Sequence, residues 1–99
     1  MEIKKNINNE SCVVELVGRL DTTTAPLLEK ELSESLNGIK ELTVDLKDLE
    51  YISSAGLRVL LAAQKQMNTQ GTMKVSNAND EVYEVFEVTG FTSILTIEK

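Results

Sequence analysis

The sequence contains no histidine, and this absence excludes a large part of protein chemistry. Ser-His-Asp and Cys-His catalytic arrangements both need an imidazole, and so do zinc sites of the usual kind. Glycine-rich phosphate-binding loops of the G-x-x-x-x-G-K-[ST] and G-x-G-x-x-G types are also missing. We therefore expect a protein that is not an enzyme, with no catalytic residues, no metal site and no cofactor.

Cysteine is almost absent as well, because Cys12 is the only one in the chain. An intramolecular disulfide is therefore impossible, and the apolar strand pattern around Cys12 favours a buried thiol. The sequence also has no run of about 18 apolar residues, the length that a membrane-spanning helix needs. Residues 1–6 lack the apolar segment of a signal peptide, so we expect a cytoplasmic protein without membrane insertion.

Positive charge is scarce, since 10 Lys and Arg residues stand against 16 Asp and Glu residues, for a formal net charge of −6. Nucleic-acid binding normally needs a basic stripe, and anionic membrane surfaces attract basic segments. We therefore expect no direct nucleic-acid binding, and a basic or mixed protein partner. The 99 residues contain no linker, repeat or low-complexity tract, which predicts one domain over residues 1–99.

Alternation of polar and apolar residues predicts the strands. It has no fault over residues 41–47, which is the pattern of a strand with one face buried and the other wet. The other strands are expected at residues 2–7, 12–17, 72–76 and 94–97, with Gly18 ending the second of them. In the strand at 41–47, the predicted inward residues are Leu42, Val44 and Leu46, and the predicted outward residues are Thr43, Asp45 and Lys47.

Helices are predicted between these strands. The first follows Thr24, the expected cap, with Pro26 tolerated in its first turn, and it closes at Asn37-Gly38. The second spans about residues 54–70, and the third is capped by Asn79 or Asp80. Their apolar stripes are Leu28, Leu32 and Leu36 in the first, Leu57, Leu60, Leu61 and Met67 in the second, and Val82, Val85, Phe86 and Thr89 in the third.

The element order is ββαβαβαβ, which indicates an α/β fold. Alternation in the strands at 41–47 and 72–76 implies that one sheet face is exposed, so the helices should pack on the other face in a single layer. Crossovers through the second and third helices require parallel neighbours. We therefore predict a two-layer architecture with a mixed β-sheet of about four to five strands.

The segment Tyr51-Ile52-Ser53-Ser54-Ala55-Gly56-Leu57 joins a strand to a helix, and it places two hydroxyls at the junction. Ser54 is expected to begin the helix and to cap it by accepting a hydrogen bond from a free backbone N–H. The same position suits a phosphate, because free N–H groups and the helix dipole favour negative charge. Taken alone, the pattern is that of an ordinary N-cap, and a phosphorylation switch needs further support.

That support comes from a resemblance to the STAS domain family, which includes anti-sigma-factor antagonists and the tails of anion transporters. The matching segments occur in the family's order and span nearly the whole chain. They are Gly18-Arg19-Leu20-Asp21, Thr24-Ala25, Leu46-Lys47-Asp48-Leu49-Glu50-Tyr51, Ser54-Ala55-Gly56-Leu57 and Phe86-Glu87-Val88-Thr89-Gly90-Phe91.

The family's junction reads Asp-Ser-[Ser/Thr]-Gly-Leu, and the serine after the aspartate is phosphorylated. Aligned through Gly56-Leu57, the resemblance implies that Ser54 is phosphorylated, while Ser53 replaces the aspartate and Ala55 replaces the second hydroxyl residue. Ser53 is the alternative site, in a less favoured position. Asp21 resembles a family residue near the phosphorylated serine, and turn chemistry is its alternative role. The implied partner-binding residues are Asp21, Thr24, Ser53, Ser54, Ala55, Gly56 and Leu57.

The resemblance implies partner switching. The unphosphorylated form of such a domain binds an anti-sigma factor that is also a serine kinase, phosphorylation by that kinase releases it, and a metal-dependent serine phosphatase restores it. A second function of the family stays open at this point: an accessory subunit of a membrane transport system, in which the same surface docks on an ATPase.

Overall fold

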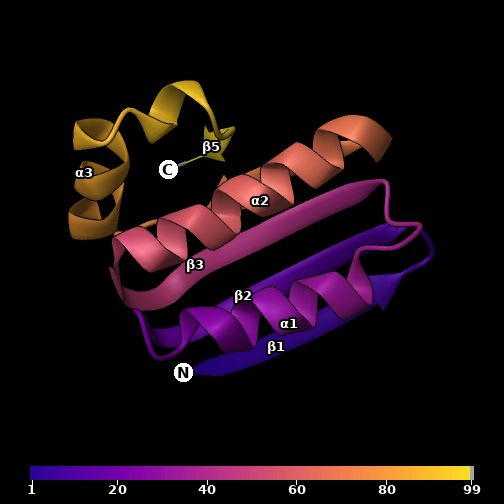
Figure 1. The fold of residues 1–99 in the computed structure, drawn as a ribbon, viewed down its shortest axis with the longest axis horizontal. Coiled ribbons are helices and arrows are strands. Elements are labelled where there is room, and N and C mark those ends of the chain that lie inside the picture. Colours follow the sequence, from indigo (N-terminus) through magenta and orange to yellow (C-terminus); the bar gives the residue numbers. More distant parts are fainter. Residues whose placement is uncertain (99) are drawn as a thin grey trace.

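The computed structural model describes residues 1–98, and one five-stranded sheet with its helices accounts for most of them (Figure 1). The predicted order of strands and helices is confirmed. The strands are β1 (Glu2–Asn8), β2 (Ser11–Leu20), β3 (Glu41–Ile52), β4 (Thr72–Ser76) and β5 (Ile97–Glu98). The helices are α1 (Ala25–Ser35), α2 (Ser54–Gln70) and α3 (Asp80–Val88), with a short 3-10 helix, η1 (Phe91–Ser93), after α3.

The strands lie in the sheet in the order in which they occur in the chain, β1-β2-β3-β4-β5. β1 and β2 form an antiparallel hairpin, whereas β2–β3, β3–β4 and β4–β5 are parallel pairs. Parallel neighbours cannot be joined by a tight turn, and each of these pairs is connected through a helix instead. The predicted mixed sheet is therefore confirmed.

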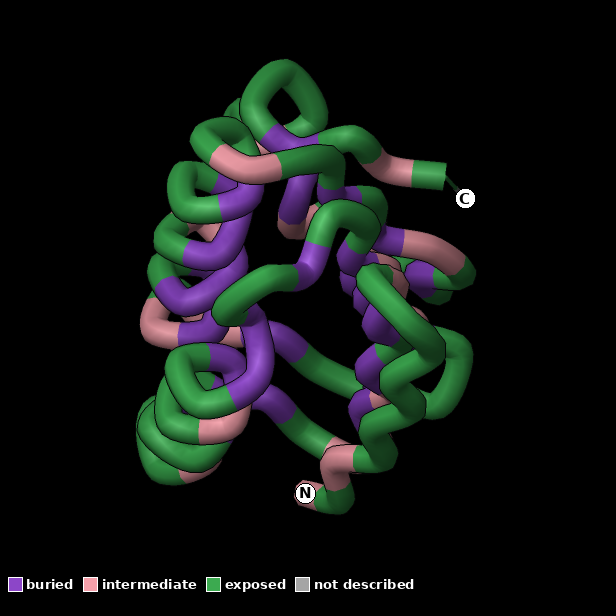
Figure 2. Tube along the Cα trace, turned by 90° about the vertical axis from the view of Figure 1, so that its right-hand side faces the viewer, coloured by how far each residue is buried: buried purple, intermediate pink, exposed green. Residues whose placement is uncertain are grey.

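The helices cover one face of the sheet, and the buried residues lie between the two layers (Figure 2). Along β3, Leu42, Val44 and Leu46 are at most 1% exposed, as predicted from the alternation. The intervening residues Thr43 and Asp45 are half-buried, and Lys47 is exposed on the uncovered face. Cys12 also lies in the core, where burial raises the pKa of its thiol.

Two strands run further than the sequence pattern predicted. β2 does not end at Gly18 but continues to Leu20, because Gly18 adopts a φ of 106° and takes up a register shift against β3. Such irregularities add a residue to one strand and let pairing resume beyond it. β3 likewise continues to Ile52, well past the alternating segment. These extensions carry both strands to the amino ends of α1 and α2.

The predictions for the C-terminal region were only partly right. The strand expected over residues 94–97 is reduced to β5, because the Ile94 N–H donates to the Phe91 carbonyl at 3.0 Å and closes a turn instead. Thr89 does not join the buried stripe of α3, since it is exposed and its hydroxyl donates to the Val85 carbonyl. Within residues 1–98, no helix has both the length and the apolar character needed to cross a membrane.

The one-sided burial of β3 predicts that truncations at neighbouring positions lower the stability by very different amounts. Leu46→Ala should lower the free energy of unfolding by about 2–5 kcal/mol, because it leaves a cavity in the core. Lys47→Ala, on the exposed face, should change it by less than about 0.5 kcal/mol. Urea denaturation of both variants tests this, and similar losses at the two positions would contradict a sheet with one open face.

Candidate functional site

The segments that carry the predicted site residues meet where β2 and β3 end. The Ser53 N–H donates to the Leu20 carbonyl at 2.9 Å, which holds the last residues of the two strands side by side. α1 and α2 both begin at this edge (Figure 1). Residues 21–24 and 53–57, which are about thirty positions apart in the sequence, therefore form one surface region.

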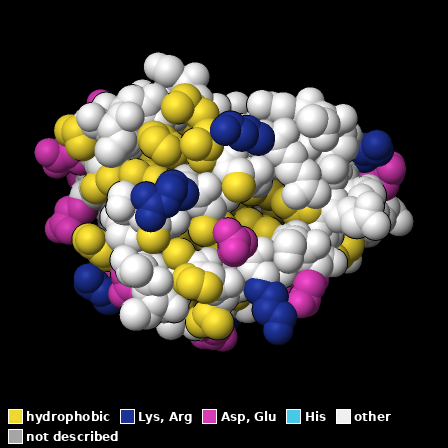
Figure 3. Space-filling model, in the orientation of Figure 1, with side chains coloured by type: hydrophobic (Ala, Val, Ile, Leu, Met, Phe, Trp, Pro, Cys, Tyr) yellow, Lys and Arg dark blue, Asp and Glu magenta, His cyan; other side chains and the backbone are white. Residues whose placement is uncertain are grey.

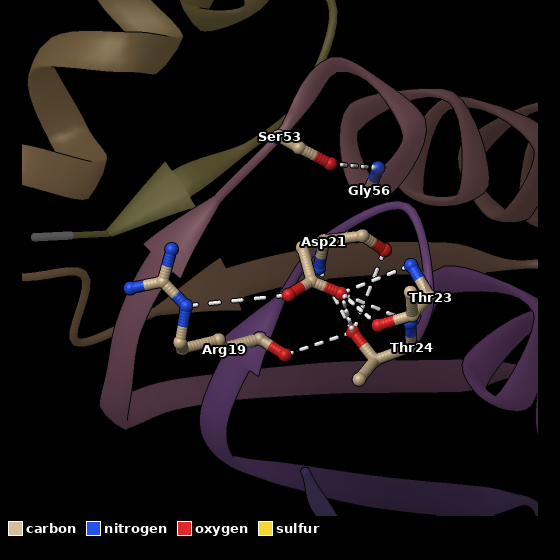
Figure 4. Close-up of polar contacts among 6 residues, drawn as sticks. All are labelled: Arg19, Asp21, Thr23, Thr24, Ser53 and Gly56. Atoms are coloured by element: carbon tan, nitrogen blue, oxygen red, sulfur yellow. Dashed lines mark hydrogen bonds and ion pairs between the residues drawn. The ribbon is translucent and has the colours of Figure 1, made fainter.

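Ser53, and not Ser54, caps α2, so the expected role of Ser54 as the cap was wrong. Ser53 has extended backbone angles, and its hydroxyl oxygen accepts from the Gly56 N–H at 3.4 Å (Figure 4). β3 continues to Ile52, which leaves Ser53 as the residue between strand and helix. Ser54 is the first residue of the helix and is exposed, and among residues 1–98 its hydroxyl has no hydrogen-bond partner.

Gly56 and Leu57 lie beneath this surface. Leu57 is 4% exposed and belongs to the core, and its N–H donates to the Ser53 carbonyl at 3.0 Å. Gly56 is buried so tightly that a Cβ atom there would come within 2.6 Å of Leu20 Cγ. These two residues hold the start of α2 against the sheet, and their place in a partner-binding surface stays a prediction. Ala55 is half-buried between them and the surface.

Asp21 organises the turn that precedes α1. Its Oδ1 accepts from the Thr23 N–H at 3.0 Å, the Thr23 hydroxyl at 2.8 Å and the Thr24 N–H at 3.1 Å (Figure 4). These donors stabilise the ionised carboxylate, and the Thr23 hydroxyl is the main reason that the pKa of Asp21 is lowered. The turn-forming role that the sequence left open for Asp21 is present.

Thr24 occupies the predicted cap position of α1, but its side chain makes no capping hydrogen bond. Its hydroxyl oxygen accepts from the Asp21 N–H at 2.8 Å and donates to the Arg19 carbonyl at 2.8 Å. The Thr24 hydroxyl therefore bonds only to other residues of this loop. The Ala25 N–H donates to the Asp21 carbonyl at 2.8 Å. The loop beside the start of α2 is held by its own hydrogen bonds.

A hollow of about 280 Å³ lies between the first turns of α1 and α2. The sequence analysis missed its one cationic residue, Arg58, which follows Ser54 by four positions and therefore lies on the same side of α2. That spacing is the signal that could have identified it. Its lining residues are Thr22, Ala25, Pro26, Glu29, Ala55, Arg58 and Val59.

Arg19 and Tyr51 form a second contact that the sequence did not indicate. The Arg19 guanidinium lies 4.4 Å from the centre of the Tyr51 ring, and its Nε is 4.0 Å from Asp21 Oδ2. A cation over an aromatic ring is a favourable arrangement at a surface. In the described part of the chain, no group of His, Cys, Asp and Glu side chains could hold a metal ion.

The chain is similar in sequence and in structure to known proteins. The model of the STAS domain family matches residues 1–99. BtrV of Bordetella bronchiseptica, provisionally named an anti-sigma factor antagonist, is 40% identical over 84 residues, covering 83% of this chain and 72% of that protein. The anti-sigma-B factor antagonist of Bacillus subtilis is 30% identical over 98 residues, covering 98% and 88%. The phosphorylated form of the Bacillus cell fate determinant SpoIIAA has the same fold, with a TM-score of 0.76, 16% identity and coverage of 99% and 92%.

The two serines should respond differently to truncation. Ser53→Ala should cost about 1 kcal/mol of unfolding free energy, because α2 loses its cap. Ser54→Ala removes an exposed hydroxyl without a partner, so its effect should stay within about 0.5 kcal/mol. Thermal and urea denaturation of the two variants decide between the positions, and a larger loss at Ser54 would restore it as the cap.

The lowered pKa of Asp21 predicts a dependence of stability on pH. Because the folded pKa lies below the unfolded value of about 3.9, the ionised carboxylate stabilises the native state above that value, and this contribution disappears as the pH falls through the folded pKa. Asp21→Asn should therefore be less stable than the parent at pH 7, with the difference shrinking in acid. Urea denaturation from pH 7 down to pH 2.5 measures this, and a difference independent of pH would refute it.

Proposed function

Because the chain belongs to the STAS domain family, we propose that it is an anti-sigma factor antagonist that phosphorylation of Ser54 inactivates. In its unphosphorylated form it binds an anti-sigma factor through the junction surface, which we define as Asp21, Thr24, Ser53, Ser54 and Ala55. The names of the relatives from Bordetella and Bacillus support this role. The proposal requires no catalytic group in the chain itself.

The observation that carries this proposal is the difference between the two adjacent serines. The Ser53 hydroxyl is used to cap α2, whereas the Ser54 hydroxyl is exposed and has no partner within residues 1–98. A kinase that transfers phosphate to Ser54 therefore breaks no hydrogen bond of the fold. Ser53 is half-buried and its oxygen already accepts from the Gly56 N–H, so a phosphate there would have to be accommodated within the existing cap, and this supports Ser54 as the acceptor.

The position of Ser54 allows a phosphate to change the surface without unfolding the domain. A phosphate adds about −1.5 to −2 charges, and the amino end of a helix favours negative charge. An interface that covers Ser54 would have to strip this charge of water or place it beside a like charge, which costs several kcal/mol unless a cation receives it. The domain stays folded while its interface fails.

The proposed cycle needs two further proteins. The anti-sigma factor is itself the serine kinase, so binding presents Ser54 to the enzyme that ends the interaction. A metal-dependent serine phosphatase then restores the free hydroxyl. Both activities belong to the partners.

Mimicking the charge at Ser54 tests the proposal. Ser54→Asp should weaken binding to the anti-sigma factor kinase of the same genome by at least about a hundredfold, since the carboxylate must be desolvated. Ser54→Asn, of nearly the same shape but neutral, should bind within about tenfold of the parent. Neither change should alter the unfolding free energy by more than about 1 kcal/mol, because the cap on Ser53 is intact. Calorimetric titration and thermal denaturation measure both quantities.

The same kinase, incubated with ATP, provides the second readout. Fragmentation mass spectrometry should place the phosphate on Ser54, and the Ser54→Ala variant should stay unmodified. A phosphate found on Ser53 alone, or equally tight binding by Ser54→Asp and Ser54→Asn, would overturn the proposed switch.

A further inference from the structure

A second groove flanks the junction surface on the side away from α1. It lies between α3 and the last residues of β3 and encloses about 210 Å³. Because Ile52 directly precedes Ser53, this groove adjoins the surface proposed to bind the anti-sigma factor. We refer to it as the α3 groove, and its lining residues are Glu50, Tyr51, Ile52, Glu81, Val82 and Val85.

The two walls of the α3 groove are fixed to each other by Asn79. The Asn79 Oδ1 accepts from the Val82 N–H at 2.8 Å and so caps α3, as the sequence predicted for this position. Its Nδ2 donates to the Leu49 carbonyl at 3.1 Å, which ties the same end of α3 to β3. One side chain thus sets the width of the groove before any partner arrives, and preorganisation of this kind lowers the cost of binding.

The charge of the α3 groove has one sign. Its charged lining residues are Glu50 and Glu81, and neither forms an ion pair within residues 1–98. Residues 75–98 contain no Lys or Arg, while α3 also carries Glu84 and Glu87. The hollow on the α1 side of α2 differs, because it contains Arg58. Figure 3 shows hydrophobic side chains exposed over this helix-bearing face, with acidic and basic side chains both at its margins and nearer its centre.

We propose that the α3 groove receives a Lys or Arg side chain of the anti-sigma factor. The inference rests on the proposed function and names the chemistry of the partner at this position. The apolar wall formed by Val82, Val85 and Ile52 suits the aliphatic stem of such a side chain, and the carboxylates of Glu50 and Glu81 suit its charged head.

The size of the α3 groove supports this occupant. Pockets for metabolites usually enclose about 300–1,000 Å³, and the α3 groove is smaller, at about 210 Å³, which fits a single side chain.

Charge-matched double variants test the inference. Glu50→Gln/Glu81→Gln removes both carboxylates of the groove, and Glu84→Gln/Glu87→Gln removes two from α3 outside its lining, so both variants change the net charge equally. Each is titrated calorimetrically with the anti-sigma factor kinase at low and high salt, after thermal denaturation has shown that it folds. We expect the first variant to bind at least about tenfold more weakly, with a reduced salt dependence, and the second to stay within about threefold of the parent.

The outcomes separate this inference from the proposed function. If the parent binds and the two double variants are weakened equally, long-range charge explains the effect and the α3 groove is not a binding site. If the parent binds and the groove variant is unaffected, the inference fails while the proposed function stands. If the parent does not bind the anti-sigma factor, the proposed function fails and the inference fails with it.

Discussion

The close approach of α2 to the end of β2 is the constraint on which the site depends. Gly56 can lie against Leu20 only because it has no Cβ, and the hydrogen bond from the Ser53 N–H to the Leu20 carbonyl fixes the strand ends at the same place. A side chain at position 56 would push the start of α2 away from the sheet. Ser53, Ser54 and Ala55 would then move relative to the Asp21 turn, and the two halves of the junction surface would separate.

Neighbouring residues at this junction have different roles. Ser53, Gly56 and Leu57 serve the fold, through the cap, the close contact and the core, respectively. Ser54 lies among them and contributes none of these interactions. A position can carry a modification at little cost to stability only if the fold does not use its side chain. The structure meets that condition at Ser54, which gives the proposed switch a physical basis that a serine at a strand–helix junction does not have by itself.

Much of the fold could be predicted because periodicity and capping are local. The alternation over residues 41–47 identified the buried face of β3, and Asn79 was one of two adjacent residues, with Asp80, that were expected to cap α3 from their place before an apolar stripe. The ends of β2 and β3 could not be predicted, since Gly18 reads as a strand terminator and here takes up a register shift that only pairing with β3 reveals. Nor could the sequence show that Ser53 rather than Ser54 caps α2, because that depends on how far β3 extends. The contact of Arg19 with Tyr51 joins two strands and has no signature in either segment.

The two hollows that flank the junction surface differ in charge. The hollow toward α1 contains Arg58 and Glu29, whereas the α3 groove presents only carboxylates among its charged groups. A partner that covers Ser54 and extends over both hollows would meet a different charge on each side. In the reversed orientation, the cationic group of the partner would lie near Arg58. Glu50 and Glu81 would then be covered without a counter-charge, and burying unpaired charges is costly. The asymmetry would therefore favour one orientation of such a partner, independently of the phosphate proposed to control its binding.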